Sequence, residues 1–168
     1  MNILIIRSAP MDVVNEVIEY LKSKFAEAKI SILAQPEVKE ELEKDSRVYE
    51  VIIYDKGFFN VFKIGYGLLN NLKKKMFDLI VILYNNPTGR SYFHPEAISF
   101  LICPKNIFVY DTNGSYYRLR FLIWFYKIIG RIFSYTIIGF LFVFIFLLWI
   151  LNKALNKAKK LVVLRRGK

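Results

Sequence analysis

The chain has 168 residues and a formal net charge of +11, and all of the excess positive charge lies in its last third. Residues 1–116 carry 14 basic and 14 acidic side chains, whereas residues 117–168 carry 11 basic side chains and no acidic one. A nucleic-acid-binding domain needs a basic face, so the neutral first part excludes nucleic acid as a partner. Anionic membrane lipids are the expected partner of the basic tail, and the single Cys103 excludes an internal disulfide.

Strand-like and helix-like segments alternate along the first 110 residues. Near-continuous apolar runs predict five strands, at residues 2–6, 29–33, 48–54, 78–83 and 106–110. The helical spacing of apolar side chains predicts helices at residues 10–25, 36–44, 58–75 and 96–102, with Ser8 as the N-cap of the first helix. Apolar runs separated by helices are typical of a parallel sheet that is covered on both faces.

These elements predict an α/β fold, a doubly wound, Rossmann-like parallel sheet of about five strands in the order 3-2-1-4-5. We expect this domain to occupy residues 1–114 and to end in a turn-rich segment at 111–115. An aromatic and basic interfacial segment (115–131), a membrane segment (132–151) and a basic tail (152–168) are expected to follow. In such a sheet, ligands bind beyond the carboxyl ends of the strands, at the loops after the first and fourth strands.

The loop after the first strand supplies Arg7 and Ser8 as candidate substrate-binding residues and Asp12 as a candidate catalytic residue. It contains neither a G-x-G-x-x-G fingerprint nor a P-loop, so the sequence predicts no cofactor. Asp12 is expected in the first turn of the following helix, where two roles are open to a carboxylate. It complements the helix dipole, or it accepts a proton from a substrate hydroxyl.

The loop after the fourth strand combines amide, hydroxyl, guanidinium, imidazole and aromatic groups around a glycine. Such a set suits a sugar or phosphate ligand, although a polar turn has a similar composition. The candidate substrate-binding residues here are Asn85, Asn86, Arg90, Ser91 and His94. For His94, a role as a helix cap or surface residue is the alternative. No cluster of His, Cys or carboxylates has the spacing of metal ligands, so no metal site is predicted.

Four segments of the sequence together resemble the N-terminal half of the ADP-heptose:lipopolysaccharide heptosyltransferase family. They are the opening strand ILIIR that runs into MDVV, the helix end LKSKFAEAKI that leads into ISIL, the segment VYEVIIYDKG, and KKKMFDLIVILYNN running into GRS. The resemblance covers about residues 2–114. It implies a GT-B glycosyltransferase architecture, in which two Rossmann-like domains face a cleft and the N-terminal domain holds the acceptor.

The resemblance implies that Asp12 is the candidate base on the acceptor hydroxyl, and that Gly89, Arg90 and Ser91 match the polar loop of the family. Met11 stands where the family has a glycine before this aspartate. Where a family member would continue into its donor domain, this chain enters an apolar segment. A lone acceptor half binds and positions a ligand, but it has no groups to stabilise a departing nucleotide diphosphate.

We therefore expect a membrane-anchored, glycosyltransferase-like module that binds a glycan or lipid-linked acceptor in cell-envelope glycan or glycolipid synthesis. A separate donor-binding protein would complete the cleft, and any activity would be that of a heptosyltransferase-like glycosyltransferase. Two alternatives stay open. One is a complete small transferase with Asp12 as its base, and the other is a non-catalytic membrane scaffold with a degenerate fold, which Met11 favours.

Residues 132–151 form an uncharged stretch of 20 residues, which as a helix is about 30 Å long, the thickness of a hydrocarbon core. This stretch predicts a membrane segment with tryptophan and basic side chains at the lipid boundary. The candidate membrane contacts are Trp124, Lys127, Arg131, Trp149 and Lys153. The sequence shows no secretory signal, so we expect the globular domain in the cytoplasm, while the positive-inside rule favours a cytoplasmic tail.

Three membrane arrangements are open for this segment. They are a re-entrant hairpin over 121–151 bent near Gly130 or Gly139, a single span with a translocated tail, and a homo-oligomer that shields the segment. A buried helix of a soluble protein is the remaining alternative, and it needs a larger core than this chain can build.

Overall fold

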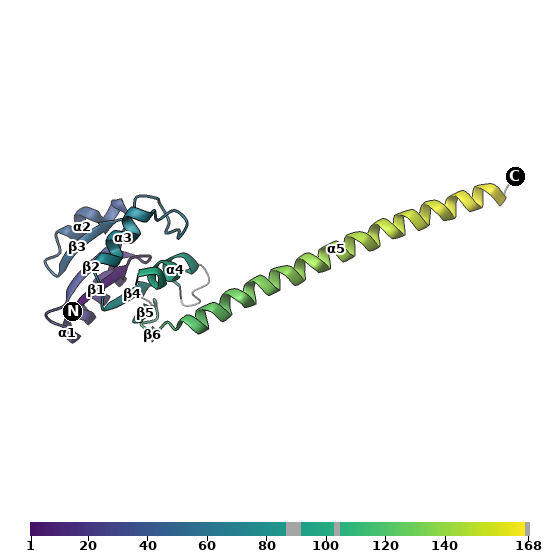
Figure 1. Ribbon diagram of the computed structural model, residues 1–168. Helices are drawn as coiled ribbons and strands as arrows, with labels where there is room; N and C mark the ends of the chain where they lie inside the picture. Colours follow the sequence, from purple (N-terminus) through teal and green to yellow (C-terminus); the bar gives the residue numbers. More distant parts are fainter. Residues whose placement is uncertain (87–91, 103–104, 167–168) are drawn as a thin grey trace. The chain divides into compact units, whose positions relative to one another are not determined.

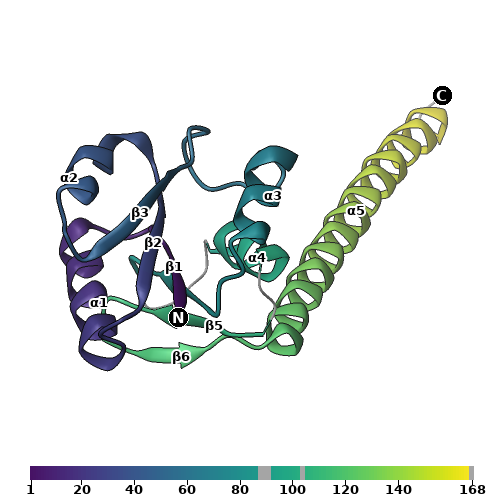
Figure 2. The same ribbon diagram turned by 60° about the vertical axis from the view of Figure 1, so that its left-hand side comes forward.

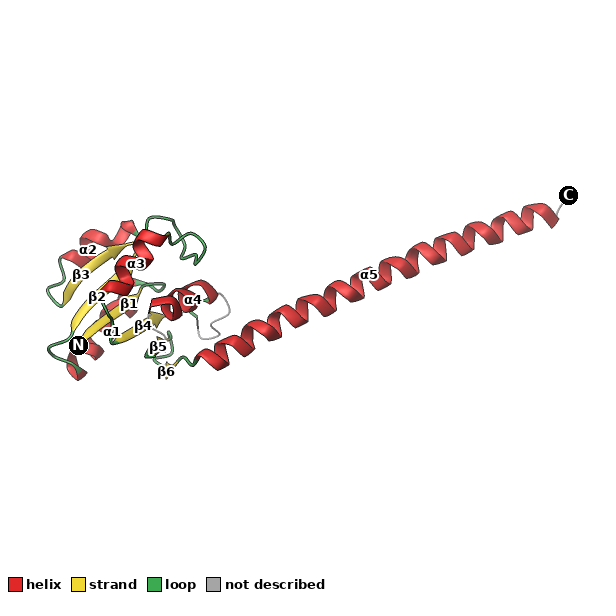
Figure 3. Cartoon of the chain, in the orientation of Figure 1, coloured by secondary structure: helices red, strands yellow, loops and turns green. Residues whose placement is uncertain are grey.

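The computed structural model describes residues 1–86, 92–102 and 105–166. The chain divides into two compact units, a globular unit of Met1–Phe121 and a C-terminal unit of Leu122–Lys168, which we describe separately. The globular unit contains a six-stranded sheet with helices packed against it, and the described residues of the C-terminal unit belong to a single long helix (Figures 1 and 3). The two loops that the sequence singles out both belong to the globular unit.

The sheet has the strand order β3-β2-β1-β4-β5-β6 (Figure 3). Its strands are β1 (Asn2–Ile6), β2 (Lys29–Ala34), β3 (Val48–Ile53), β4 (Leu79–Leu83), β5 (Ile107–Tyr110) and β6 (Tyr116–Arg118). The first five strands pair in parallel, so the predicted doubly wound order 3-2-1-4-5 is confirmed. The apolar runs located these strands well because each strand contributes side chains to a buried face.

Strand β1 lies in the middle of the sheet, and its side chains alternate between two separate cores. Ile3 and Ile5 pack with α1 (Met11–Lys24) and α2 (Lys39–Glu43), whereas Leu4 and Ile6 pack with α3 (Tyr66–Lys74) and α4 (Phe93–Ile102). Figure 2 shows the two pairs of helices on opposite faces of the sheet. A short 3-10 turn, η1 (Pro36–Val38), precedes α2, so the single helix expected at 36–44 is divided in two.

The sixth strand was not predicted from the sequence. Tyr116–Arg118 pairs antiparallel with β5, whereas we expected residues 115–131 to form one interfacial segment. Asp111 closes the turn between the two strands, because its Oδ1 accepts hydrogen bonds from the backbone N–H groups of Asn113 (2.9 Å) and Ser115 (3.0 Å). Turn chemistry, rather than an apolar run, therefore adds this strand to the edge of the sheet.

The helix expected at residues 58–75 begins only at Tyr66, and a loop precedes it. Gly65, the residue before the helix, has a φ of +72°, which lies outside the helical region and favours glycine. Phe59 and Ile64 of this loop are buried in the same core as α3. The apolar residues of the loop therefore extend the helical spacing that the sequence shows for α3. The expectation was therefore wrong for the first half of this segment.

The last element, α5, runs from Phe121 to Arg166 as one helix (Figure 1). It passes Gly130 and Gly139 without a break, so the re-entrant hairpin considered from the sequence is not formed. By length and composition alone, Phe121–Ile150 is suited to cross a membrane, and its most apolar window is not buried in the structure. The five expected membrane contacts all lie on this helix: Trp124, Lys127, Arg131, Trp149 and Lys153.

Replacing Ile82 with alanine should lower the free energy of unfolding of the globular unit by about 2–5 kcal/mol. Ile82 is fully buried in β4, next to the central strand, and the shorter side chain leaves a cavity. The matched control, Ile82→Val, should lose only about 0.5–1.5 kcal/mol. Urea unfolding of the full chain in detergent micelles, read out by protease cleavage within the globular unit, measures both values. Equal losses for the two variants would contradict tight packing around this strand.

Candidate functional site

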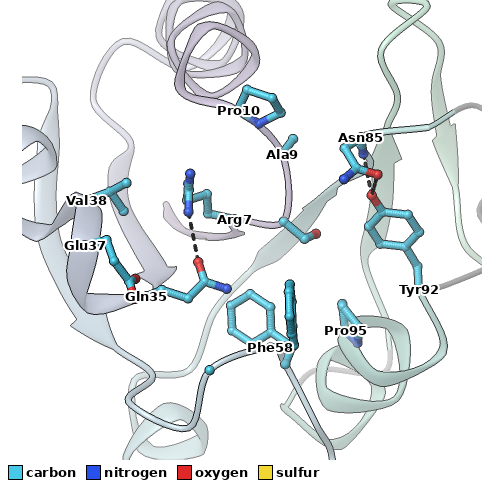
Figure 4. Close-up of a pocket in the computed structure, with 13 residues that line it drawn as sticks. Arg7, Ala9, Pro10, Gln35, Glu37, Val38, Phe58, Asn85, Tyr92 and Pro95 are labelled. Carbon is cyan, nitrogen blue, oxygen red and sulfur yellow. Dashed lines mark hydrogen bonds between the residues drawn. The ribbon is translucent and has the colours of Figure 1, made fainter.

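A pocket of about 810 Å³ opens at the carboxyl ends of the strands (Figure 4). Its lining comes from the segments that follow β1, β2, β3 and β4: residues 7–10, Gln35, Glu37, Val38, residues 57–59, Asn85, Tyr92 and Pro95. The segments after β1 and β4 are the two loops at which the strand order reverses. The pocket therefore lies where open α/β sheets bind ligands.

Arg7 supplies the positive charge of this pocket. Its Nη1 donates a hydrogen bond to Oε1 of Gln35 at 3.0 Å, and Figure 4 shows the side chain extending into the space between the loops. Its Nε is buried and has no hydrogen-bond partner within the described part of the chain. The guanidinium is thus fixed in orientation by Gln35 and keeps donors for a ligand, which suits a phosphate or carboxylate.

Ser8 links the loops that follow β1 and β4, which we call the two switch-point loops because the strand order reverses there. Its Oγ donates a hydrogen bond of 2.5 Å to the carbonyl oxygen of Leu83, the last residue of β4. Ser8 does not act as the predicted N-cap, because Pro10 holds that position in α1 and makes no side-chain cap hydrogen bond. Since the hydroxyl proton is engaged with Leu83, Ser8 offers a ligand an acceptor rather than a donor.

Asn85 is held at the pocket by Tyr92. The Tyr92 hydroxyl accepts a hydrogen bond from the backbone N–H of Asn85 and donates one to the Asn85 side-chain oxygen. Asn86 follows, and its Nδ2 donates to the same oxygen at 3.3 Å. The side-chain oxygen of Asn85 is therefore occupied, which leaves its amide N–H groups as donors at the pocket wall.

Behind Tyr92 lies a buried pair that sequence reasoning missed. The rings of Tyr84 and Tyr92 stack with their centroids 3.9 Å apart. The Tyr84 hydroxyl donates a hydrogen bond to Oε1 of Glu96, and both residues are buried. Burial, and next the Glu96 carboxylate, hold the pKa of Tyr84 well above its usual range. Tyr84 therefore stays a hydrogen-bond donor to this carboxylate at all physiological pH values.

Asp12 and His94 do not line the pocket. Asp12 is exposed in the first turn of α1. His94 lies in the first turn of α4, where its Nδ1 accepts a hydrogen bond from the backbone N–H of Val61 at 3.4 Å. The ring of Phe62 meets the His94 imidazole edge to face at 6.1 Å. His94 thus contacts the loop between β3 and α3, which agrees with a structural role.

The pocket brings together three of the predicted site residues, Arg7, Ser8 and Asn85. Arg90 and Ser91 lie outside the described residues. Gln35 and Phe58, among others, were not predicted, because candidates were sought only in the loops after the first and fourth strands. In a parallel sheet the loops after the second and third strands end at the same edge, and this rule would have added them. Tyr92 follows the fourth strand and was also not predicted as a pocket residue.

The chemistry of the lining favours a ligand with negative charge or many hydroxyl groups. Arg7 and Asn85 are donors, Glu37 is an exposed acceptor, and the rings of Phe58 and Tyr92 offer apolar faces. In the described ranges, no three His, Cys, Asp or Glu side chains gather in a way that would hold a metal ion. The donors and rings of the lining suit a sugar or phosphate ligand.

No protein-family model and no curated protein matches the sequence. Among solved structures, the chain is similar to ADP-heptose LPS heptosyltransferase II of E. coli, with a TM-score of 0.51 and 19% sequence identity. The similarity covers 68% of this chain and 31% of that chain, so this chain spans less than a third of the length of that enzyme. The expected Rossmann-like α/β fold is thereby confirmed, and it is similar to part of the fold of that enzyme.

Tyr84→Phe should lower the free energy of unfolding by about 1–3 kcal/mol at neutral pH, because it leaves the buried Glu96 carboxylate without this donor. The folded protein retains the Tyr84 proton that the unfolded chain releases at its ordinary pKa of 10.0. The stability of the native protein should therefore fall as the pH rises above 10.0, and Tyr84→Phe should make that fall shallower.

Urea unfolding at a series of pH values measures both effects of the Tyr84 substitution. Tyr66→Phe is the control, because Tyr66 is 84% exposed and its substitution should change the neutral-pH value by less than about 0.5 kcal/mol. An alkaline slope for Tyr84→Phe equal to that of the native chain would show that Tyr84 ionises freely in the folded protein.

Proposed function

We propose that this chain is a membrane-anchored, glycosyltransferase-like module that binds a glycan or lipid-linked acceptor in cell-envelope glycan or glycolipid synthesis. The heptosyltransferase-like fold is the starting point. The observation that carries the proposal is the pocket at the carboxyl ends of the sheet, in which Arg7 and Asn85 present donors beside aromatic faces. Guanidinium and amide donors recognise phosphates and sugar hydroxyls, and rings pack on a sugar face.

The proposed role is acceptor binding because the described residues contain one sheet domain, whereas the GT-B architecture uses two. Among the described residues, β6 is followed by α5. We propose that a separate protein supplies the sugar-nucleotide site and faces this pocket. In such a pair this chain would position the acceptor, and the partner would stabilise the departing nucleotide.

Membrane anchoring through α5 is the second part of the proposal. Trp124 and Trp149 are about 37 Å apart along the helix at about 1.5 Å per residue, a distance that agrees with the separation of the two interfaces of a bilayer. Lys153 follows with its Nζ 5.0 Å from the centre of the Trp149 ring, a pairing suited to the headgroup region. An anchored domain would act on acceptors that are themselves held in the membrane.

A non-catalytic scaffold is the second candidate, and the position of Asp12 favours it. The proposed base is exposed and lies outside the pocket lining, and Met11 stands where the related family has glycine. A base must come within hydrogen-bond reach of the hydroxyl from which it takes the proton. Catalysis by Asp12 therefore requires that the acceptor extend over the N-terminus of α1 toward the partner.

Arg7→Met should weaken the binding of sugar phosphates by the full chain about 10- to 150-fold, because hydrogen bonds to a charged group contribute about 1.5–3 kcal/mol. Calorimetric titration in detergent micelles, with sugar phosphates and the corresponding free sugars, measures this loss. Arg7→Lys should be intermediate, since it keeps the charge but loses the planar donor geometry. Lys73→Met, in the last turn of α3, is the control. Unchanged binding by Arg7→Met would remove the pocket as the acceptor site.

Purification of the full chain from its native membranes in mild detergent should recover a protein with a sugar-nucleotide-binding domain. In the pair, Asp12→Asn should abolish sugar transfer while leaving acceptor binding unchanged. If the native pair transfers no sugar and Asp12→Asn supports normal growth, the non-catalytic scaffold is the correct function. Recovery of no such partner, together with no glycan binding by the chain, would contradict both parts of the acceptor-binding proposal.

A further inference from the structure

The loop between β3 and α3, together with the first residue of α3, exposes aromatic rings to an unusual degree. Phe58 is 94% exposed, and Phe62 and Tyr66 are each 84% exposed. These are the highest exposures of any large apolar side chain in the described part of the globular unit. Scattered exposed apolar residues are ordinary, but three protruding rings on one short segment mark an interaction surface. We call Phe58, Phe62 and Tyr66 the ring cluster.

The loop that carries the ring cluster is fixed to the domain by its other residues. Phe59 and Ile64 are buried in the core. The Tyr54 hydroxyl accepts a hydrogen bond from the backbone N–H of Asn60 at 3.0 Å and donates one to the Asn60 carbonyl oxygen at 3.2 Å. The Nδ1 of His94 accepts a further backbone hydrogen bond from the same loop. The rings are therefore held outward by a built structure and are not merely part of an unanchored segment.

The segment that carries the ring cluster is basic, whereas Glu37, which lines the pocket with Phe58, is an exposed carboxylate. Lys56 and Lys63 lie within the loop and are exposed, and residues 56–77 contain no acidic side chain. Asp55, directly before this stretch, lies 3.3 Å from Lys56 as an exposed ion pair, which contributes little. Exposed rings beside lysines suit a partner that has an apolar interior and an anionic surface.

An anionic bilayer fits this combination better than a protein partner does. Lysine is depleted in protein–protein interfaces, whereas aromatic rings at the headgroup level with lysines reaching the phosphates are typical of membrane surfaces. Phe58 also lines the pocket, so the ring cluster is continuous with the proposed acceptor site. A lipid-linked acceptor could thus pass from the bilayer into the pocket without crossing open water.

We propose that the β3–α3 loop inserts the ring cluster into the headgroup region of an anionic bilayer, with Lys56 and Lys63 on the lipid phosphates. This second membrane contact would orient the pocket opening toward the lipid surface. The inference rests on the proposed anchoring by α5, which brings the globular unit to a membrane.

The test places an environment-sensitive fluorophore at position 62, as Phe62→Cys in a Cys103→Ser background, with the full chain in nanodiscs. The control carries the same fluorophore at Tyr49→Cys, because Tyr49 is also an exposed aromatic, 63% exposed, at the start of β3. With anionic lipid, the probe at position 62 should shift to the blue and be quenched by spin-labelled lipid. The probe at position 49 should show neither change.

The charge contribution is tested in the same system. Lys56→Gln and Lys63→Gln should each lower the ratio of embedded to solvent-exposed probe at position 62 about fivefold, since a basic residue near an anionic surface contributes about 1 kcal/mol. Lys39→Gln with Lys44→Gln, on and directly after α2, is the matched control and should leave the ratio unchanged.

Flotation of the full chain with anionic vesicles separates this inference from the anchoring on which it rests. If the chain floats but the probe at position 62 behaves like the probe at position 49, the loop inference is wrong while the anchoring stands. If the chain does not float, both fail. A shift of the probe at position 62 that is equal in zwitterionic and anionic nanodiscs would overturn the role of the lysines.

Discussion

The parallel pairing of five strands is the constraint from which the rest of the globular unit follows. Each crossover must pass over one face of the sheet, so both faces are covered by helices. The alternation of Ile3 and Ile5 against Leu4 and Ile6 in β1 serves the two cores at once. All five parallel strands end at the same edge, which is why segments far apart in the sequence form one pocket.

The pocket side chains are held by a chain of contacts that reaches into the core. Asn85 is bound by Tyr92, Tyr92 stacks on Tyr84, and Tyr84 donates a hydrogen bond to the buried Glu96. A buried carboxylate is costly unless it is hydrogen-bonded, so Glu96 and Tyr84 depend on each other. Side chains fixed in this way lose little entropy when a ligand binds. Asp12 is exposed in the first turn of α1 and does not share this support.

The sequence predicted those features that depend on burial along the chain, namely the parallel strands, their order and the two switch-point loops. It did not predict β6, because that strand depends on the turn closed by Asp111. The loop before α3 was mistaken for helix, because buried loop residues kept helical spacing up to Gly65. Gln35 and Phe58 were missed at the pocket because only the loops after β1 and β4 were considered, although the loops after β2 and β3 end at the same edge of the sheet.

Only Leu119 and Arg120 separate β6 from α5, and Leu119 is buried in the core of the globular unit. If α5 anchors the chain in a bilayer, as proposed, this short connection tethers the globular unit to the membrane, and its pocket samples the solution near the membrane and not the whole compartment. Amphiphilic ligands that diffuse in the same leaflet are then met at a high local concentration, so even weak intrinsic affinity is sufficient for occupancy. Soluble sugars with the same headgroup chemistry have no such advantage.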